Sequence, residues 1–432
     1  MNKFLEVKEF DIITGNPNFK NDEKYKYLDT VAFENLIEFI HQFTANEEVA
    51  DVLDFMRISY KRNIGNIVSI KNYVGLIQMK NGYQIQILPK ISFTNSDDSE
   101  NRNTKKIFLN MLRSMRDFPS KVFNNSNIQV ERMNLYEIFI NMYLQEIRRL
   151  IKIGIKSDYI FKEDNLNYYK GKLLTSQHFK INLVHKERFY VAYDEFNPNR
   201  VENKLIKATL LKLQKLTTSA ENSKEIRQLL VFFEIIDASM NYTADFSKVR
   251  INRSNRDYEM IMQWSKVFLL NKSFTTFSGN NNSRALLFSM EKVYESYVAK
   301  HLKKILGEDG WNVSSQDRGY YLFTKPRLQF ALIPDIVCKR GERTIIMDTK
   351  WKKLVNNERI NYGISQSDMY QMYAYSKKYK ASEIWLLYPL NDEMKEHSEI
   401  SFNSGDGTTV NIYFVDLENI QSSLEVLRDK IR

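Results

Sequence analysis

Cysteine, proline and glycine are all scarce in this sequence. Among 432 residues there are 1 cysteine, 7 prolines and 14 glycines. A single cysteine, Cys338, excludes an internal disulfide framework and a cysteine-rich zinc site. Because Cys338 lies in an apolar run, we expect a thiol packed in a core. The shortage of proline and glycine argues against a disordered or fibrous chain and favours packed domains.

Long apolar runs and several common motifs are also missing. No uninterrupted apolar stretch reaches about 18 residues, so no transmembrane helix is expected. The start, "MNKFLEVKEF", lacks the apolar region of a signal peptide, which makes a cytoplasmic location the expectation. No G-x-x-x-x-G-K-[ST] segment occurs, so we expect no nucleotide bound through a P-loop. The 5 histidines are scattered, and none has a convincing metal-ligand spacing.

What the chain does contain is enough apolar material for sizeable cores and an excess of positive charge. Hydrophobic residues make up 43% and aromatic residues 13%. The formal net charge is +10 and the pI is about 9.2. A basic excess suits a polyanionic partner such as nucleic acid. The alternative is a generally lysine-rich chain, because 53 acidic residues dilute the signal.

The length predicts two or three domains. Helical periodicity dominates the middle of the chain, and a polar run, Gly279 to Ser283, is the candidate for the last boundary. Beyond it, the segment "RALLFSMEKVYESYVAKHLKKIL" is expected to be one helix, followed by strands, a helix, strands and a final helix. This order predicts a central sheet flanked by helices in a multidomain chain of the α+β or α/β class. The expected regions are 1–130 (mixed β/α), 131–280 (largely helical) and 281–432.

A hairpin is predicted near the start of the chain. The alternating runs "YVGLIQM" and "YQIQILPKI" flank Asn81-Gly82, and Asn-Gly between such runs is a strong turn signal. The hairpin spans Tyr73 to Ile91. Its simplest interpretation is a structural β-ribbon.

A second predicted hairpin carries two acids where buried strands should be apolar. In "LIPDIVCKRGERTIIMDTKWKKL", Gly341-Glu342 suits a two-residue type II′ turn. Residues paired across that turn have numbers that add to 683, and Asp335 and Asp348 satisfy this condition. We therefore predict that the two aspartates lie opposite each other, with Cβ atoms about 4.5–5.5 Å apart. A slip of one residue would place them on opposite faces.

Lys350 shares the face of Asp348, because side chains two apart on a strand point the same way. Opposed like charges destabilise a sheet, and a bound divalent cation removes that penalty. Carboxylate oxygens and waters suit Mg²⁺, with Mn²⁺ as a substitute. Two acids, a metal and an adjacent lysine are the parts needed for phosphodiester hydrolysis. The alternative is Asp348 paired with Lys350 or Lys352 and no metal.

The stretch "PDIVCKRGERTIIMDTK" resembles the PD-(D/E)xK nuclease signature, with Pro334-Asp335 as its first half and Asp348-Thr349-Lys350 as its second. The longer stretch from Leu332 to Leu354 is similar to the McrC family, the nuclease subunit of McrBC modification-dependent restriction systems. Four further segments resemble that family in the same order: "YVGLIQMKNGYQIQILPKI", "NPNRVENKLIKATLLKL", "FSMEKVYESYVAKHL" and "SDMYQMYAYSKKY". The resemblance spans about Tyr73 to Tyr379 and implies that 281–432 is a PD-(D/E)xK nuclease domain with a restriction-endonuclease-like fold.

The resemblance also implies roles for individual residues. Asp335 and Asp348 would be metal ligands, and Lys350 would assist catalysis. An acid on the preceding helix would join the metal; the family pattern points to Glu295, while Glu291, one turn away, stays open. Further residues would contact DNA or support Lys350, with ordinary packing or solvation as the alternative: Gln371, Tyr375 and Lys352. Trp351 alternates away from the acids and is expected in the core.

McrC-like proteins act with a separate AAA+ GTPase hexamer, McrB. The resemblance therefore implies such a partner, stimulated by this chain, and modified double-stranded DNA as substrate, with no membrane. Region 1–130, including the Tyr73 to Ile91 hairpin, would dock on the partner. Three alternatives stay open: the nuclease of a related system that reads an unmodified sequence, a catalytically inert adaptor of the motor, and a stand-alone repair nuclease. The base modification, the cut position and the stoichiometry cannot be read from the sequence.

Overall fold

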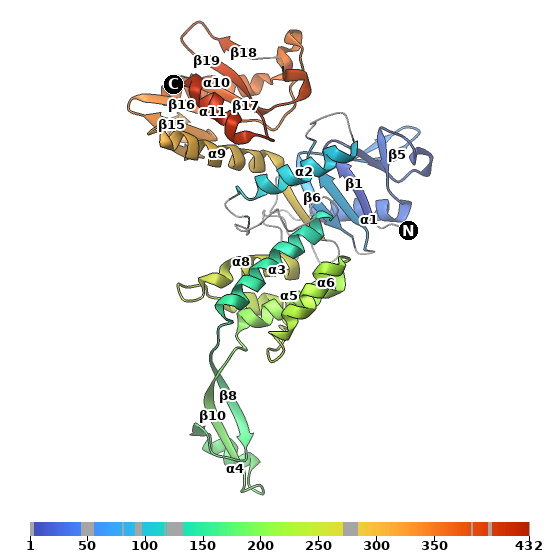
Figure 1. Ribbon diagram of the computed structural model, residues 1–432, viewed down its shortest axis with the longest axis vertical. Helices are drawn as coiled ribbons and strands as arrows, with labels where there is room; N and C mark the ends of the chain where they lie inside the picture. The colour runs from blue at the N-terminus through green and yellow to red at the C-terminus, as the bar shows by residue number, and fades with distance from the viewer. Residues whose placement is uncertain are drawn as a thin grey trace. The chain divides into compact units, whose positions relative to one another are not determined.

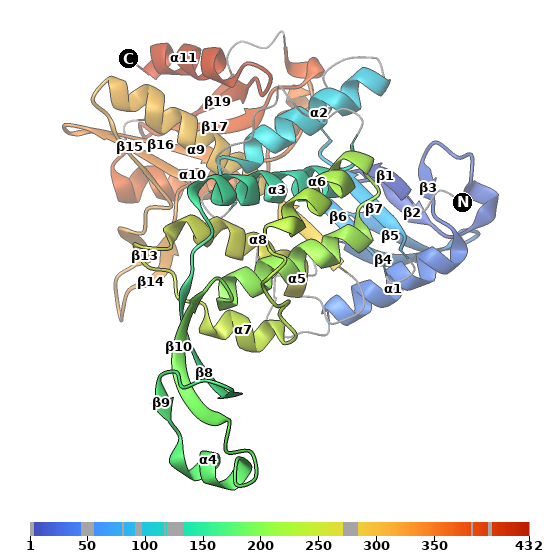
Figure 2. The same cartoon turned by 60° about the horizontal axis from the view of Figure 1, so that its bottom comes forward.

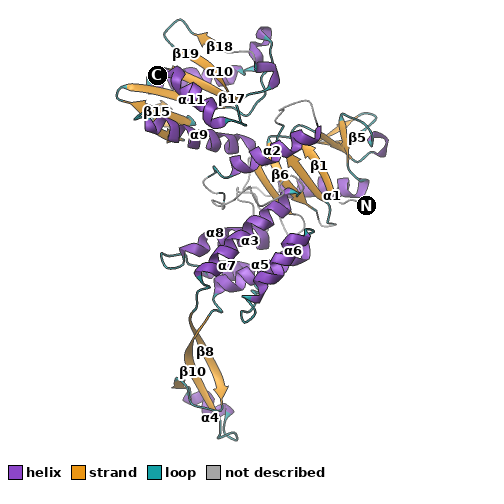
Figure 3. Cartoon of the chain, in the orientation of Figure 1, coloured by secondary structure: helices purple, strands orange, loops and turns teal. Residues whose placement is uncertain are grey.

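The computed structural model describes residues 4–44, 56–79, 82–90, 97–115, 118, 133–270, 284–381, 383–395 and 400–431. These residues form a multidomain α+β structure with several sheets and many helices (Figure 3). The chain divides into two compact units. Unit 1 comprises Met1–Phe118, Gln129–Glu131 and Asn282–Arg432, and unit 2 comprises Pro119–Ile128 and Arg132–Asn281. Unit 2 is thus inserted in the sequence of unit 1. The three regions expected from the sequence stay a prediction, and the polar run from Gly279 to Ser283 lies outside the described residues.

The first sheet of unit 1 joins segments from both ends of the unit. Its strand order is β1-β7-β6-β11, with bounds β1 Phe4–Lys8, β7 Gln84–Leu88, β6 Tyr73–Gln78 and β11 Arg284–Ser289. The expectation that Arg284 begins a helix is wrong, because β11 pairs antiparallel with β6. The run "ALLF" is apolar throughout and shows neither helical nor strand periodicity. Whether it forms a helix or a strand therefore depends on a partner strand far away in sequence. The helix, α9 (Met290–Glu308), begins directly after the strand.

The predicted hairpin at Tyr73 is present, and its strands lie in the middle of this sheet. β6 and β7 pair antiparallel from Gly75↔Ile87 to Gln78↔Gln84, and almost all of their residues are buried. Lys80, Asn81 and Ile91 lie outside the described residues. Docking of the partner on this hairpin stays a prediction.

Gly75 lets β11 approach β6 closely. Its φ is +136°, and a Cβ at this position would lie 1.9 Å from the carbonyl oxygen of Leu286. Only glycine tolerates both the backbone conformation and the contact. This residue therefore fixes the seam between the early and late segments of unit 1.

A second sheet of unit 1 has the order β3-β2-β5-β4. Its strands are β2 Ile12–Thr14, β3 Tyr25–Tyr27, β4 Met56–Lys61 and β5 Gly65–Ile70, and the chain between them also forms the short 3-10 helix η1 Pro17–Phe19 and the helix α1 Thr30–Thr44. The next helix, α2 Asp97–Leu112, contacts β7 of the first sheet and α9. The helical period of "TVAFENLIEFIHQF" is confirmed by α1.

Unit 2 combines packed helices with a long β arm. The helices are α3 Leu135–Ile153, α5 Val201–Leu216, α6 Ala220–Val231, α7 Tyr242–Lys248, the 3-10 helix η4 Arg256–Tyr258 and α8 Glu259–Leu270. The arm consists of β8 Asp158–Leu166, β9 Lys172–Leu173, α4 Thr175–Ile181 and β10 Phe189–Asn197, in the sheet order β8-β10-β9. Within the unit, the β8–β10 ribbon extends away from the helices and ends near α4 (Figure 1).

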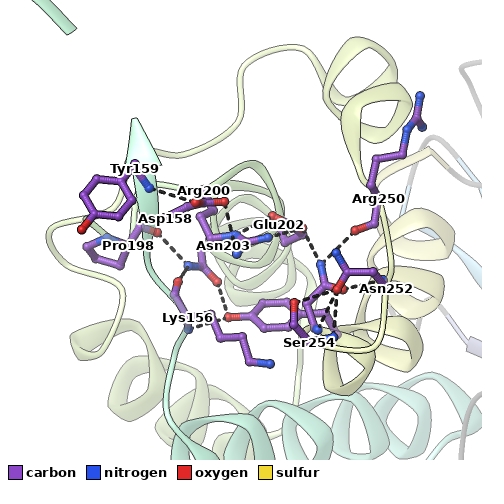
Figure 4. A network of polar contacts seen from close by, with 12 residues as sticks. Lys156, Asp158, Tyr159, Pro198, Arg200, Glu202, Asn203, Arg250, Asn252 and Ser254 are labelled. Atoms are coloured by element: carbon purple, nitrogen blue, oxygen red, sulfur yellow. Dashed lines mark hydrogen bonds and ion pairs between the residues drawn. The ribbon is translucent and has the colours of Figure 1, made fainter. Parts of the chain in front are cut away.

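A buried amide joins both strands of this arm to the helices. Asn203 of α5 is 0% exposed. Its Nδ2 donates to the carbonyl oxygens of Lys156 at 3.0 Å and Pro198 at 2.7 Å, just before β8 and just after β10. Its Oδ1 accepts from the hydroxyl of Tyr258 at 2.9 Å, and that hydroxyl accepts from the N–H of Lys156. Figure 4 shows the contacts of Asn203 with Lys156 and Pro198.

An ion-pair network continues from this amide. The Arg200 guanidinium donates to both carboxylate oxygens of Glu202, at 3.2 and 3.0 Å, and lies 3.5 Å from Asp158. Asn255 donates to the same Glu202 at 3.1 Å. The base of the arm is therefore held by a network of polar groups with mutual partners.

The last sheet of unit 1 is six-stranded and mixed, with the order β12-β15-β16-β17-β19-β18. β16, β17 and β19 are parallel neighbours, which Figure 2 shows side by side. The bounds are β12 Asn312–Ser315, β15 Ile336–Arg340, β16 Arg343–Thr349, β17 Glu383–Pro389, β18 Ile400–Asn403 and β19 Thr409–Val415. The small hairpin β13 Tyr320–Phe323 and β14 Gln329–Leu332 precedes β15, and the remaining elements are η5 Glu358–Gly363, α10 Gln366–Tyr379, η6 Asp392–Met394 and α11 Ile420–Ile431.

Residues alternate between the two faces of this sheet. Val337 and Ile346 belong to one core cluster with Met372 and Tyr375 of α10. Trp351, of the opposite parity to Asp348 and Lys350, is buried as expected. Its ring lies 5.4 Å from that of Tyr294 on α9. The helices α10 and α9 therefore cover opposite faces.

The structure bears on two expectations from the composition, a cysteine packed in a core and the lack of a transmembrane helix. Cys338 is a buried free cysteine, and burial raises the pKa of its thiol to about 12. None of the helices in the described ranges is both long enough and apolar enough to cross a membrane.

Candidate active site

The hairpin of β15 and β16 has the predicted register. Ile336 pairs with Met347 and Arg340 with Arg343, so the paired numbers add to the expected constant. Gly341 has φ +58°, the conformation that the first central position of a type II′ turn requires. One step beyond the last ladder pair, Asp335 falls opposite Asp348. The turn glycine therefore determines that the two acids share a face.

Asp335 is held at the end of β16 by a threonine. Its Oδ2 accepts from the backbone N–H of Thr349 at 2.8 Å and from the hydroxyl of Thr349 at 2.6 Å. Burial, and after it the charge of Glu295, raises the pKa of Asp335 to about 6. The two hydrogen bonds act in the opposite direction, because they favour the ionised carboxylate.

Asp348 is almost completely buried, with 2% of its surface exposed. Burial, and after it the charge of Asp335, raises the pKa of Asp348 to about 7. The ammonium of Lys350 lies 2.8 Å from Asp348 Oδ2 and lowers that pKa in part. A buried acid whose pKa is raised further by a neighbouring acid creates a demand for positive charge in this position.

Lys350 stands in a network that involves α10. Its Nζ lies 3.4 Å from Asp368 and donates to Gln371 Oε1 at 3.2 Å. Gln371 Nε2 donates to the hydroxyl of buried Tyr375 at 2.7 Å. Burial alone would lower the pKa of Lys350, but Asp348 and Asp368 raise it above its ordinary value, so the ammonium is charged at neutral pH. The structure thus places Gln371 beside Lys350 and Tyr375 behind Gln371.

The two candidate glutamates of α9 have different surroundings. Glu295 accepts from Gln316 at 2.6 Å. Burial, and then the charge of Asp348, raises the pKa of Glu295. Glu291 is exposed and accepts from Asn72 at 2.9 Å. Glu295 is therefore the acid of this pair that interacts electrostatically with both aspartates.

These residues surround a cavity of about 830 Å³. The exposed Lys352 lines it and donates to the carbonyl oxygen of Gly363 at 2.5 Å. Residues from the start of the chain contribute to the wall: Phe10, Asn72 and Lys90. Within the described ranges, no three or more His, Cys, Asp or Glu side chains are grouped closely enough to hold a metal ion by themselves.

Sequence reasoning missed Glu9. It is 0% exposed, and Trp351 Nε1 donates to its two carboxylate oxygens at 3.0 and 3.3 Å. The N–H of Lys90 donates to it as well, at 3.0 Å. Burial raises the pKa of Glu9 to about 7. Sequence reasoning also missed Asp368, which lies near Lys350. The only signal in the sequence was its spacing of one helical turn from Gln371, and such a spacing is common on helices.

Fold and site together define a multidomain α+β protein with a buried carboxylate–lysine centre. The sequence profile of the family described as "McrBC 5-methylcytosine restriction system component" matches residues 68–389. The chain belongs to this McrBC family, which confirms the resemblance seen in the sequence.

Two solved structures share the fold. A chain in the refined half-complex of a tetradecameric assembly of Thermococcus gammatolerans McrB AAA+ hexamers with bound McrC has a TM-score of 0.73 and 19% identity; the alignment covers 98% of this chain and 100% of that one. A chain of the T. gammatolerans McrBC complex, solved by cryo-EM, has a TM-score of 0.51 and 20% identity, with 70% and 88% covered. No curated protein sequence matches the chain.

Proposed function

We propose that this chain is the DNA endonuclease subunit of a McrBC-type restriction complex. The observation that carries the proposal is the convergence of Asp335, Asp348 and Lys350 at one end of β15 and β16. Family membership supports a role in restriction. The convergence supports a PD-(D/E)xK nuclease, in which a phosphodiester is hydrolysed beside two acids and a lysine.

The side chains present fit a Mg²⁺ ion. Besides burial, neighbouring negative charges raise the pKa of all three acids: Glu295 acts on Asp335, Asp335 on Asp348, and Asp348 on Glu295. Mg²⁺ needs only one or two protein carboxylates and completes its shell with waters and phosphate. Asp335 and Asp348 would hold the ion, with Glu295 as the additional acid. When bound, Mg²⁺ supplies Lewis acidity and lowers the pKa of a coordinated water.

The chain's own residues supply orientation and charge. Thr349 fixes one oxygen of Asp335, which leaves the other free to face the cavity. Lys350 is kept charged by Asp348 and Asp368, and Gln371 aims its ammonium. An ammonium so placed stabilises the negative charge that develops on the phosphoryl oxygens during attack.

A McrB-like AAA+ GTPase hexamer is the proposed partner. The structure with a TM-score of 0.73 is of McrB hexamers with bound McrC. By analogy, recognition of modified DNA and translocation belong to the partner, and this chain cleaves and stimulates the GTPase. This assignment rests on fold-level likeness.

The decisive experiment is co-purification with a McrB-like GTPase, followed by cleavage of methylated and unmethylated DNA with GTP and Mg²⁺. We expect Mg²⁺-dependent cleavage of methylated DNA that Asp348→Ala abolishes while the complex still assembles. Equal cleavage of both DNAs would instead indicate a system that reads an unmodified sequence. Cleavage by the Asp348→Ala complex would overturn the nuclease assignment.

A second candidate is an inert adaptor of the motor. The described residues contain no ready-made group of three metal-binding side chains, and the Lys350 ammonium already neutralises Asp348. An adaptor predicts GTPase stimulation with no cleavage of any DNA in Mg²⁺ or Mn²⁺. The same reconstitution separates the two functions.

A further inference from the structure

The small hairpin that precedes Asp335 has an unusual surface. Its segment "RGYYLFTKPRLQFAL", Arg318 to Leu332, contains three cationic residues and no acidic residue. Around its tip, Phe323 is 54%, Leu328 60% and Phe330 69% exposed. The rings of Phe323 and Phe330 contact each other edge to face, 5.9 Å apart. Large apolar side chains grouped in water mark an interaction site.

The backbone is strained where it exposes one of these rings. Phe330 has φ +57°, a conformation that a bulky residue rarely adopts. The ladder pairs Tyr321 with Ala331 and Phe323 with Gln329, so the regular pairing is interrupted at Phe330, opposite Leu322. Such strained conformations cluster at functional sites. Here the strained backbone of Phe330 keeps an aromatic side chain exposed to solvent.

The base of the hairpin, in contrast, is fixed to the nuclease core. The hydroxyl of buried Tyr379 on α10 donates to Asp317 at 2.8 Å and to the carbonyl oxygen of Leu332 at 3.3 Å. The ring of Tyr320 packs on that of Tyr379 with centroids 4.3 Å apart. The tip is thus carried on a rigid base.

The hairpin also leads directly to the candidate active site. Leu332 ends β14, and Asp335 follows after Ile333 and Pro334. Ile333 lines the same cavity as Asp335 and Asp348. Three residues of extended chain span at most about 10 Å. The base of the hairpin therefore lies within about 10 Å of Asp335, so a duplex long enough to cover both can contact the hairpin while one of its phosphates is at Asp335.

We propose that the hairpin Arg318 to Leu332 enters a groove of double-stranded DNA beside the phosphodiester that is cleaved. Arg318, Lys325 and Arg327 contact phosphates, and Leu328 and Phe330 contact the bases. The inference rests on the proposed nuclease function. The charge of the hairpin favours DNA as its ligand. In the described part of the chain, none of these three cations forms an ion pair, and a segment without acidic residues suits a polyanion. Two-stranded β ribbons are of a size that fits a DNA groove.

The first test is photo-crosslinking with the full-length chain. Phe330 is replaced by p-benzoylphenylalanine, and the protein is irradiated with a fluorescein-labelled duplex. We expect a covalent DNA adduct. The control carries the same residue at Tyr60, which is 75% exposed on β4, and should give none. No adduct at position 330, or an adduct only with a second copy of the chain, overturns the proposal.

The second test measures affinity for the same duplex against salt concentration. Lys325→Ala/Arg327→Ala should reduce the slope of log K against log salt by about 2 and weaken binding at low salt about tenfold or more. The control, Lys303→Ala/Lys304→Ala on the exposed face of α9, should change neither. An unchanged slope for the hairpin variant overturns the proposal.

The proposed nuclease function and the proposed role of the hairpin can be tested separately. If the hairpin variants bind and cleave DNA as the unmodified chain does, while Asp348→Ala is inactive, the hairpin inference fails and the nuclease function stands. If Asp348→Ala still cleaves, the nuclease assignment fails even where the adduct at position 330 is seen. Because the substituted tip residues are exposed, thermal unfolding should be unchanged in all hairpin variants, which excludes misfolding as a cause.

Discussion

The indole Nε1 of Trp351 donates to both carboxylate oxygens of Glu9, across almost the whole length of the sequence. Trp351 directly follows Lys350, and Glu9 directly follows β1. The first strand of the chain thereby holds the segment that carries the candidate catalytic lysine. A change in the N-terminal sheet can thus affect the candidate active site through one hydrogen-bonded pair.

Glu9→Gln should alter the pH dependence of stability. The pKa of Glu9 rises from 4.5 to about 7 in the folded protein, so the native state binds the proton more tightly than the unfolded chain. The contribution of protonated Glu9 to the stability of the folded chain is fully present below pH 4.5 and is lost as the pH rises through 7. The variant lacks this loss. Relative to the unmodified chain, the free energy of unfolding of the variant should therefore rise by roughly 3 kcal/mol between pH 4.5 and pH 8.

Urea unfolding at both pH values, followed by tryptophan fluorescence, measures this difference. Glu342→Gln, on the exposed turn of the β15–β16 hairpin, is the control and should follow the unmodified chain. Parallel stability curves for Glu9→Gln and the unmodified chain would contradict the assignment of a buried, protonated Glu9.

Mg²⁺ should stabilise the isolated chain more at pH 8 than at pH 5. The raised pKa values of Asp335, about 6, and Asp348, about 7, mean that both acids hold protons at pH 5 and would have to release them to a cation. At a hundredfold excess over the dissociation constant, binding adds about 2.7 kcal/mol. Asp335→Asn/Asp348→Asn should show no Mg²⁺ effect, whereas the exposed Asp392→Asn should behave normally. Differential scanning calorimetry decides, and a Mg²⁺ effect that survives in the double variant would place the ion elsewhere.

Thr349→Val should move the acid limb of the cleavage pH profile upward. The substitution removes the hydroxyl that donates to Asp335 but keeps the backbone N–H. Loss of a hydrogen bond to the ionised form raises the pKa of Asp335 further, so a higher pH is needed for the same ionisation. The rate at pH 6 should fall more than the rate at pH 8, with a loss of stability of about 1 kcal/mol. Thr349→Ser, which restores the hydroxyl, should restore the profile; a uniform loss at all pH values would indicate a packing effect alone.

Gly75→Ala should destabilise unit 1 strongly. The new Cβ would lie 1.9 Å from Leu286 O, and φ is +136°. Gly65→Ala is a matched control, since φ is +93° there but no atom lies within 4 Å of the new Cβ. The control should cost about 1 kcal/mol from backbone strain, and Gly75→Ala several kcal/mol. Equal unfolding midpoints in urea would mean that β11 does not press on β6.

Asn203→Ala should loosen the arm of unit 2. Three polar groups lose a buried partner: the carbonyls of Lys156 and Pro198 and the hydroxyl of Tyr258. Each unsatisfied buried group costs about 1–3 kcal/mol. Amide hydrogen exchange should accelerate in β8 and β10 but not in α3. Uniform acceleration across the unit would show that Asn203 supports the helices and not the arm in particular.

Local reasoning predicted the β15–β16 hairpin because the information lies within one turn. The glycine at position 341 fixes the register, and the register brings Asp335 and Asp348 to one face. The helices α1 and α10 were predictable for the same reason, since their apolar residues repeat within a few turns.

Features that depend on distant partners could not be predicted. β11 was interpreted as helix because its pairing partner, β6, lies on the far side of unit 2 in sequence. Glu9 looked like one of many acids, and nothing near it in sequence indicates Trp351. For Lys350, the charge was evident, but its contacts with Asp368 and Gln371 depend on how α10 packs on the sheet.

The pairing of β6 with β11 also sets an order of assembly during synthesis. On the ribosome, β6 waits with one open edge until Arg284 and its neighbours have been made. At roughly 5–20 residues per second this wait is on the order of 10–40 s. An unpaired edge is a hazard for aggregation in that interval. It also means that a product truncated within unit 2 carries Glu9 and Asn72 but no aspartate pair, so the cavity is completed only after the last of its lining residues, Asn391, has been added.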